Sequence, residues 1–368
     1  MRIIQSVESL DSQAGSLEYL LRGLFEALRA RNVETPVVRL SDAAAATGGV
    51  EAGNGAPRSA IDAIPFERAT ATRLVQNADL VHVHGWSHRN ARDIAVVARA
   101  TGTPYVISPC GAFSGERYVE QGWITKLRSR LFERSAVRTA AAVTAVNDEE
   151  ERELRDRNLN DNITPLPYGL TFGDYEGSAA LAQEGRAAPQ GRCLLLLGPI
   201  HPAEGCVPLF KALAEIGSDT QGWKLVLAGP ATGEWRQMLE AAVERKDWAE
   251  RITFAPAPDL SALRAWLAGA SILASPSLRI HGPVSILQAI ASGVPVLAST
   301  CVAPPGLEHV IRVCAPRREA FKPALATLLE LSDQERADLA REARELGRSL
   351  FDWSVLADRY LDFYKKLI

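Results

Sequence analysis

The stretch SPSLRIHGPVSILQAIASGVPVLAS, residues 275–299, decides the fold of this chain. It starts with a Pro-Ser turn at the end of an apolar strand and passes through a loop containing Gly282 into a short apolar helix. A Gly-Val-Pro turn at Gly293 then leads into a second apolar strand. A loop before a helix N-terminus is a natural place to hold a phosphate. The stretch contains no carboxylate, however, and its cations are Arg279 and, when protonated, His281.

The alternation of strand and helix in this stretch continues over most of the chain. Short β-rich runs alternate with amphipathic helical segments from residue 1 to about residue 170, and a second series begins at residue 193. This pattern predicts parallel sheets covered by helices on both faces. A chain of 368 residues is also too long for one ordinary core. The predicted fold class is therefore α/β, with two doubly wound Rossmann-like domains facing a central cleft where the strands end.

The domain boundaries are predicted from composition and periodicity. Residues 173–190 are polar and Gly-rich and lack sustained periodicity, so we expect them to form an interdomain linker. The N-terminal domain then covers residues 1–172, and the C-terminal domain covers residues 191–351. The last segment, residues 352–368, is predicted to be one amphipathic helix.

The composition narrows the possible classes of function. Apolar residues make up 47% and charged residues 23% of the chain, as in ordinary soluble proteins, and the net charge of −3 gives no support for a nucleic-acid partner. The five cysteines are scattered without a CxxC pair, which argues against a structural zinc site and for a reducing compartment. No apolar run approaches the ~20 residues of a transmembrane helix, and the N-terminal run is too short for a signal peptide. We therefore expect a cytoplasmic protein.

Three histidines near one predicted strand raise the question of a metal site. His82 and His84 lie two residues apart, so their side chains share one face of the strand, and His88 follows in the loop. No Asp, Glu or Cys accompanies them nearby. Packed or hydrogen-bonded histidines are therefore the favoured interpretation, and no metal is expected.

Two further loops follow predicted strands in the N-terminal half. Gly15 stands just before a helix and is a candidate phosphate contact, with a plain glycine turn as an equal alternative. The segment SPCGAF breaks a strand at Gly111, where the backbone can approach a ligand closely. Cys110 in this loop is a candidate nucleophile, but no accompanying His/Asn pattern is evident, so an inert thiol is favoured.

Several well-defined motifs are absent from the sequence. It contains no GxGxxG after a strand, no Walker A loop, no GxSxG elbow and no HExxH. These absences argue against a dehydrogenase, a P-loop kinase and a serine hydrolase.

The loops taken together resemble those of the family 4 (group 1) retaining glycosyltransferases, which have the GT-B fold. ADLVHVHGW, TPYVISPCGAF and ITPLPYGL resemble the family's N-terminal motifs in order and spacing, and LLLLGPIHPAEGCVPLFKAL and residues 275–299 resemble the two C-terminal ones. The resemblance covers nearly the whole chain. It implies a nucleotide-sugar donor, no metal or other cofactor, and a closing helix 352–368 that packs back on the N-terminal domain.

The departures from the family pattern fall on the donor site that the resemblance implies. The family's Arg and Lys, which neutralise the donor diphosphate, are Pro199 and Glu204 here, and its two glutamates are Ile280 and Gln288. Losing two charge-assisted contacts of about 1.5–3 kcal/mol each would weaken donor binding by several orders of magnitude. Gln288 can still hold a ribose hydroxyl through its amide.

The candidate site residues follow from the residues and the resemblance together. The catalytic group is unassigned, with His84 and Cys110 as candidates, and Arg279 is the best replacement for the missing cations because of its reach and forked donors. His201 and His281 can each donate one further bond. The expected donor-binding residues are Gly15, Gly111, Gly198, His201, Gly205, Arg279, His281, Gly282, Val284, Ser285 and Gln288.

Two functions from different classes are consistent with these residues. The first is a glycosyltransferase that moves a sugar from a nucleotide-sugar donor to a saccharide or lipid-linked saccharide acceptor, as in the synthesis of surface polysaccharides or glycoconjugates. The alternative is a catalytically silent relative that acts as a binding or scaffold subunit. The predicted helix 123–138 has a basic side suited to peripheral contact with the inner face of an anionic membrane, although a solvated basic face is the favoured alternative because Glu133 dilutes it.

Overall fold

The structure is a computed structural model of the chain. It describes residues 1–7, 17–39, 63–86, 89–113, 134–177, 191–217, 222–230, 251–256 and 258–368, together with a few residues between 234 and 239. Two compact units are present. Unit 1 comprises Met1–Ser12, Leu21–Leu166 and Ala357–Ile368, and unit 2 comprises Gln13–Leu20 and Pro167–Leu356.

Unit 1 is built on a parallel sheet of seven strands in the order β3-β2-β1-β4-β5-β6-β7. The order reverses direction between β1 and β4, which makes the sheet doubly wound as predicted. The strands are β1 (Ile3–Val7), β2 (Val37–Arg39), β3 (Ala63–Pro65), β4 (Leu80–His84), β5 (Tyr105–Ser108), β6 (Ala142–Ala145) and β7 (Ile163–Pro165).

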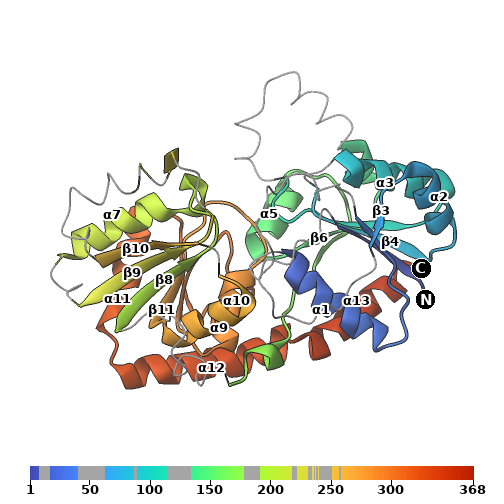
Figure 1. Ribbon diagram of the computed structural model, residues 1–368. Helices are drawn as coiled ribbons and strands as arrows, with labels where there is room; N and C mark the ends of the chain where they lie inside the picture. Colours follow the sequence, from blue (N-terminus) through green and yellow to red (C-terminus); the bar gives the residue numbers. More distant parts are fainter. Residues whose placement is uncertain are drawn as a thin grey trace. The chain divides into compact units, whose positions relative to one another are not determined.

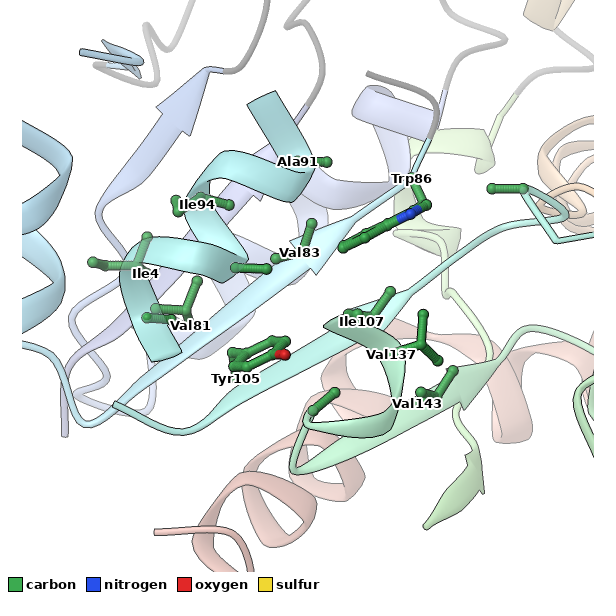
Figure 2. Packing of buried hydrophobic residues seen from close by; sticks show 14 of the residues in the cluster. Ile4, Val81, Val83, Trp86, Ala91, Ile94, Tyr105, Ile107, Val137 and Val143 are labelled. Carbon is green, nitrogen blue, oxygen red and sulfur yellow. The ribbon is translucent and has the colours of Figure 1, made fainter. Parts of the chain in front are cut away.

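Helices cover this sheet because each carries an apolar stripe. Figure 2 shows Ala91 and Ile94 from a helix in one buried cluster with Val81 and Val83 of β4 and Tyr105 of β5. All these side chains are buried, so the core continues from helix to sheet without a polar gap. The described helices that contribute to unit 1 are α1 (Leu17–Arg29), α2 (Arg68–Gln76), α3 (Arg89–Thr101), α5 (Asp148–Asp156) and α13 (Trp353–Lys365).

Unit 2 repeats this design with six parallel strands in the order β10-β9-β8-β11-β12-β13 (Figure 1). Its order reverses between β8 and β11. The strands are β8 (Arg192–Leu197), β9 (Trp223–Ala228), β10 (Ile252–Ala255), β11 (Ile272–Ser275), β12 (Val296–Ser299) and β13 (Arg312–Cys314).

The helices of unit 2 pack against its sheet and against each other. Leu209 of one helix and Phe321 of another belong to a single buried cluster with strand residues such as Leu225, which places both helices on one face. The described helices are α7 (Cys206–Ile216), α9 (Leu260–Gly269), α10 (Val284–Ala291), α11 (Arg318–Glu330) and α12 (Asp333–Phe351), with the short 3-10 helices η3 (Phe172–Tyr175) and η4 (Pro202–Glu204).

The structure differs from the predicted linker at its N-terminal end. Residues 173–177 do not form a free connector, because η3 buries the side chains of Phe172 and Tyr175 within unit 2. The contact-based division also falls after Leu166 and not after residue 172. Polar composition misled the prediction here, since two aromatic side chains suffice to anchor a short helix.

The chain returns to unit 1 within its last helix. The predicted helix 352–368 corresponds to α13, whose residues from Ala357 onward group with unit 1. There Tyr364 bonds to His82 of β4, and Asp358 forms an ion pair with Arg31 at 2.5 Å. These contacts fasten the last turns of the chain to the first sheet.

Candidate functional site

The candidate site lies in unit 2, where its strand order reverses. β8 and β11 are neighbours there, and their carboxyl ends continue into residues 198–205 and 276–283. Doubly wound sheets bind ligands outside the carboxyl ends of the strands at such a switch point. Both loops were singled out from the sequence, and the structure brings them together.

The two loops are fastened to each other through the backbone. Leu278 donates its N–H to the Ala203 carbonyl at 2.8 Å. Gly205 has a φ of +73°, and a Cβ built on it would lie 1.9 Å from the Pro276 carbonyl oxygen. Only glycine permits both this conformation and this approach. Gly205 is therefore required by the packing of one loop on the other.

Side-chain hydroxyls hold the shape of the loop after β11. Ser277 accepts the N–H of Arg279 and donates to the carbonyl of the same residue, both at 3.1 Å. Ser299 at the end of β12 donates to the Ser277 carbonyl at 2.6 Å. Ser277 and Ser299 are buried, so these bonds are made away from water and fix the loop backbone.

Glu204 and His281 form an ion pair across the two loops. The Glu204 Oε2 atom lies 3.4 Å from His281 Nε2, and the other ring nitrogen, Nδ1, lies 2.9 Å from the Gly282 carbonyl oxygen. Both ring nitrogens thus face acceptors, and only the doubly protonated imidazolium can donate to both.

The electrostatics of this pair favour its charged form. Burial lowers the pKa of His281, but the hydrogen bond and negative charge of Glu204 outweigh it, so the pKa lies above the usual 6.5. Burial raises the pKa of the Glu204 carboxyl, and the hydrogen bond and positive charge of His281 outweigh that effect, so its pKa lies below 4.5. In this geometry Glu204 and Gly282 accept both N–H groups of His281, and the predicted bond from His281 to a donor diphosphate stays a prediction.

The helix after this loop begins in a way that attracts anions. α10 has Pro283 as its N-cap, no side-chain cap, and no acidic residue in its first turn. Its first-turn residues include Val284 and the partly exposed Ser285. The helix dipole and the first N–H groups favour a negative charge at such an N-terminus. Arg279, partly buried three residues upstream of Gly282, adds a permanent positive charge to the same loop.

The two positions that align with the family glutamates are buried. Ile280 and Gln288 are 5% and 1% exposed. The Gln288 side chain bonds the Tyr175 hydroxyl, which donates to the Tyr19 hydroxyl at 3.4 Å, and Tyr19 donates in turn to Asp174 at 3.3 Å. The Gln288 amide is thus buried and already bonded to Tyr175, so it does not stand open to a ribose hydroxyl in this structure.

Three further predicted donor-site residues of unit 2 lie on the same two loops. Gly198 is exposed, with a φ of +139°. His201 caps η4, because its Nδ1 accepts the N–H of Ala203 at 3.1 Å, and its ring stands edge-on to Trp235. This bond uses the lone pair of Nδ1, so the geometry does not present Nδ1 of His201 as a donor to a ligand. Gly282 lies beside Leu17 and Tyr168, which would touch a side chain placed there.

The two described histidines of unit 1, His82 and His84, are buried and hydrogen-bonded, as their sequence context favoured. His82 bonds Tyr364 at 2.7 Å and Ser108 at 2.6 Å, and His84 bonds Gln5 at 2.7 Å. Burial lowers the pKa of His82 to about 3 and that of His84 well below its usual value, so both rings are neutral. Among the described residues, no three His, Cys, Asp or Glu side chains gather into a metal-binding group.

The loop after β5 is held by a buried carboxylate that sequence reasoning missed. Glu150 accepts the N–H of Gly111 at 2.6 Å and that of Val146 at 2.9 Å, while Cys110 takes a left-handed φ of +52°. The Gly111 amide is therefore used internally, and the contact of this glycine with a ligand stays a prediction. Glu150 follows the helix cap Asn147 by three residues, a signal from which its inward position could have been found.

Several predicted features lie outside the described residues. These are Gly15, His88 and the helix 123–138 up to residue 133, so the phosphate contact, the third histidine and the membrane-facing side stay predictions. In the described part of the chain, no helix is both long and apolar enough to cross a membrane.

Comparison with known families matches both halves of the chain. Residues 15–169 match a family model described as a glycosyl transferase 4-like domain, and residues 191–331 match one described as glycosyl transferases group 1. Two relatives named D-inositol 3-phosphate glycosyltransferase come from Segniliparus rotundus and Nocardia farcinica. The first relative is 27% identical, and the match covers 55% of this chain and 46% of the relative. The second is 25% identical, and the match covers 81% of this chain and 68% of the relative. The match thus spans about half the length of the first relative.

Solved structures of similar fold extend over the whole chain. Sucrose-phosphate synthase from Thermosynechococcus elongatus superposes with a TM-score of 0.73 at 19% identity, covering 100% of this chain and 98% of that one. Anabaena HepE in complex with UDP-glucose superposes with a TM-score of 0.73 at 16% identity, covering 100% of both chains. At such identities the likeness shows a shared fold.

Proposed function

The chain belongs to the group 1 glycosyltransferases and has their GT-B fold, and we propose that it transfers a sugar from a nucleotide-sugar donor to a hydroxyl of an acceptor. The observation that carries this proposal is the switch point of unit 2. There the loops after β8 and β11 meet beside Arg279 and the uncapped N-terminus of α10. A multiply charged anionic leaving group such as a nucleoside diphosphate suits this combination.

In the proposed reaction, the donor diphosphate lies against the first turn of α10. The Val284 N–H already donates to the Gly282 carbonyl, so the next N–H groups of that turn and the Arg279 guanidinium stabilise the charge that develops as the sugar–phosphate bond breaks. No metal is needed for this stabilisation. A retaining outcome is expected from the family resemblance alone. The group that accepts the proton of the incoming hydroxyl stays unassigned. The Ile280 side chain has no polar atom, and His84 is buried and neutral.

The donor and acceptor classes are supported by similar proteins. The HepE structures contain UDP or UDP-glucose, which favours a uridine diphosphate sugar here. The named relatives act on D-inositol 3-phosphate, a small polyol phosphate. We keep a saccharide or lipid-linked saccharide as the proposed acceptor, with a polyol phosphate as the alternative to be tested. A cytoplasmic location at the inner membrane face is part of the same proposal.

A second function is favoured by a specific observation in the same site. The Gln288 side chain is buried against Tyr175, and Glu204 places a carboxylate where the family has a cation. A protein that keeps the fold but has lost the reaction would show such internal bonding. The alternative is therefore a silent binding or scaffold subunit.

Calorimetric titration separates the two functions. We expect UDP and UDP-glucose to bind the wild type, Arg279→Ala to weaken binding by at least tenfold, and Arg312→Ala, an exposed arginine on β13, to change nothing. Release of UDP from UDP-glucose in the presence of acceptor then tests transfer itself. If the wild type binds neither UDP nor GDP at millimolar concentration, the silent subunit is the better account.

A further inference from the structure

The Glu204–His281 ion pair joins the two loops of the candidate site and sets their charge. Glu204 comes from η4 after β8, and His281 comes from the loop after β11. The side chains are partly open to solvent, with 24% of Glu204 and 39% of His281 exposed. A charged ligand arriving at these loops therefore meets the pair directly, and the pair is not sealed in the core.

The charged groups that face the pair are few among the described residues. Arg279 acts electrostatically on both members, and the Ser277 hydroxyl can donate to Glu204 in place of the Arg279 carbonyl. From α7, the Cys206 thiol lies close to Glu204, and burial raises its pKa to about 12, so the thiol stays neutral. His201 on η4 is engaged as an acceptor, and α10 brings no acid in its first turn.

The balance of these charges depends on His281. When its ring is protonated, Arg279 and His281 outweigh Glu204 and the three side chains carry one net positive charge. When the ring is neutral, Glu204 cancels Arg279 and the loops carry none. Glu204 also accepts the same His281 N–H that a phosphate oxygen would need. The carboxylate therefore opposes an incoming anion in two ways, through its charge and through the donor it occupies.

We propose that Glu204 acts as an internal anion that competes with the diphosphate of a nucleotide ligand for His281 and the start of α10. The diphosphate binds by displacing the carboxylate from the imidazolium, and the carboxylate returns when the nucleotide leaves. Glu204 thereby sets how tightly, and in which pH range, the site holds a diphosphate. This role takes the class of ligand from the proposed function, but it does not require that the protein be catalytically active.

The pH dependence follows from the direction of the His281 shift. His281 is cationic below its raised pKa, so diphosphate binding is tighter there and weakens as the pH rises through that value. Replacing Glu204 by Gln removes the competing negative charge beside Nε2 of His281, while Nδ1 keeps its bond to Gly282. It also takes away the partner that holds the pKa of His281 up. The variant should thus bind more tightly and depend less on pH above 7.

The test uses calorimetric titration of inorganic pyrophosphate and of UDP into the full chain at pH 6 and pH 8.5. We expect Glu204→Gln to bind both about tenfold more tightly than the wild type at pH 8.5, because one opposing charge is removed at short range. His281→Asn should weaken binding at pH 6. Glu330→Gln, an exposed glutamate on α11, is the matched control and should behave as the wild type. Melting curves verify that each variant is folded.

The outcomes separate this inference from the proposed function. If the wild type binds UDP but Glu204→Gln binds no better at either pH, the internal-anion role is wrong and the proposed function stands. If only Glu204→Gln binds UDP, the internal anion is supported and the active transferase loses its support. If neither protein binds UDP or pyrophosphate, both are wrong.

Discussion

The Glu150 carboxylate accepts the backbone N–H of Gly111 at 2.6 Å and thereby ties the turn after β5 to the start of α5. The side chain is 3% exposed and its second oxygen accepts the Val146 N–H. Burial raises the pKa of Glu150 to about 7, although both backbone bonds favour the carboxylate. A structural acid of unit 1 thus titrates near neutral pH.

Glu150 makes the stability of unit 1 depend on pH. Its folded pKa of about 7 lies above the ordinary 4.5, so the folded state binds the proton more tightly than the unfolded one. The free energy of unfolding therefore falls as the pH rises from about 4.5 to about 7, by about 3 kcal/mol from this group alone. We expect Glu150→Gln to flatten this part of the profile in urea unfolding at pH 5, 6.5 and 8.

The comparison needs a control that carries no buried charge. Asp156→Asn changes an exposed residue on the same helix. This variant should keep the pH dependence of the unfolding free energy that the wild type shows. At pH 5 the Glu150→Gln variant is expected to be less stable than the wild type, because its amide offers one acceptor for two N–H groups. If the free energy of unfolding depends on pH in the same way in Glu150→Gln and in the wild type, Glu150 does not titrate in this range.

Two glycines with nearly the same backbone conformation give a sharper packing test. Gly205 and Gly293 have φ values of +73° and +75°, but a Cβ at Gly205 would meet the Pro276 carbonyl at 1.9 Å, whereas one at Gly293 would meet nothing within 4 Å. Gly293→Ala should cost only the left-handed strain, about 1–2 kcal/mol. Gly205→Ala should cost clearly more and should also disturb the candidate site.

Thermal melting and UDP titration check this pair of variants. We expect both to melt below the wild type, with Gly205→Ala lowest, and only Gly205→Ala to lose nucleotide affinity. Equal losses of stability in the two variants would contradict the close loop contact.

The Tyr364 hydroxyl is predicted to anchor the last helix. It bonds the buried and neutral His82, which also bonds Ser108. Tyr364→Phe leaves a ring nitrogen of His82 without its partner, at a cost of about 1–3 kcal/mol. Chemical denaturation should show this loss, and Asp362→Ala on the exposed side of α13 should show almost none. If Tyr364→Phe leaves the free energy of unfolding unchanged, a water molecule must replace the lost hydroxyl.

Much of the fold could be predicted from sequence because the apolar strands are long enough to be recognised. The alternation around 275–299 predicted β11, α10 and β12, and the structure confirms a doubly wound sheet there. β3 and β13 were missed; both are three-residue strands at the edge of their sheets. Buried aromatic residues in η3 were hidden in polar sequence.

The sequence could place the candidate site residues on their loops, but it could not predict which side chains pair with each other. Arg279, His281 and Gly205 could be placed on two loops because both loops follow predicted strands. That Glu204 meets His281 depends on which strands are neighbours, and spacing along the chain carries no such information. The same holds for Glu150 with Gly111 and for Gln288 with Tyr175, in which a buried polar group meets a partner distant in sequence.

A crystal structure of the chain grown with UDP at millimolar concentration tests the central claim most directly. We expect UDP bound in unit 2 at the carboxyl ends of β8 and β11, with its diphosphate at the first turn of α10 and within hydrogen-bond reach of Arg279. The Glu204 carboxylate should have moved away from His281. Nucleotide bound elsewhere, or no nucleotide with the Glu204–His281 pair intact, would contradict it.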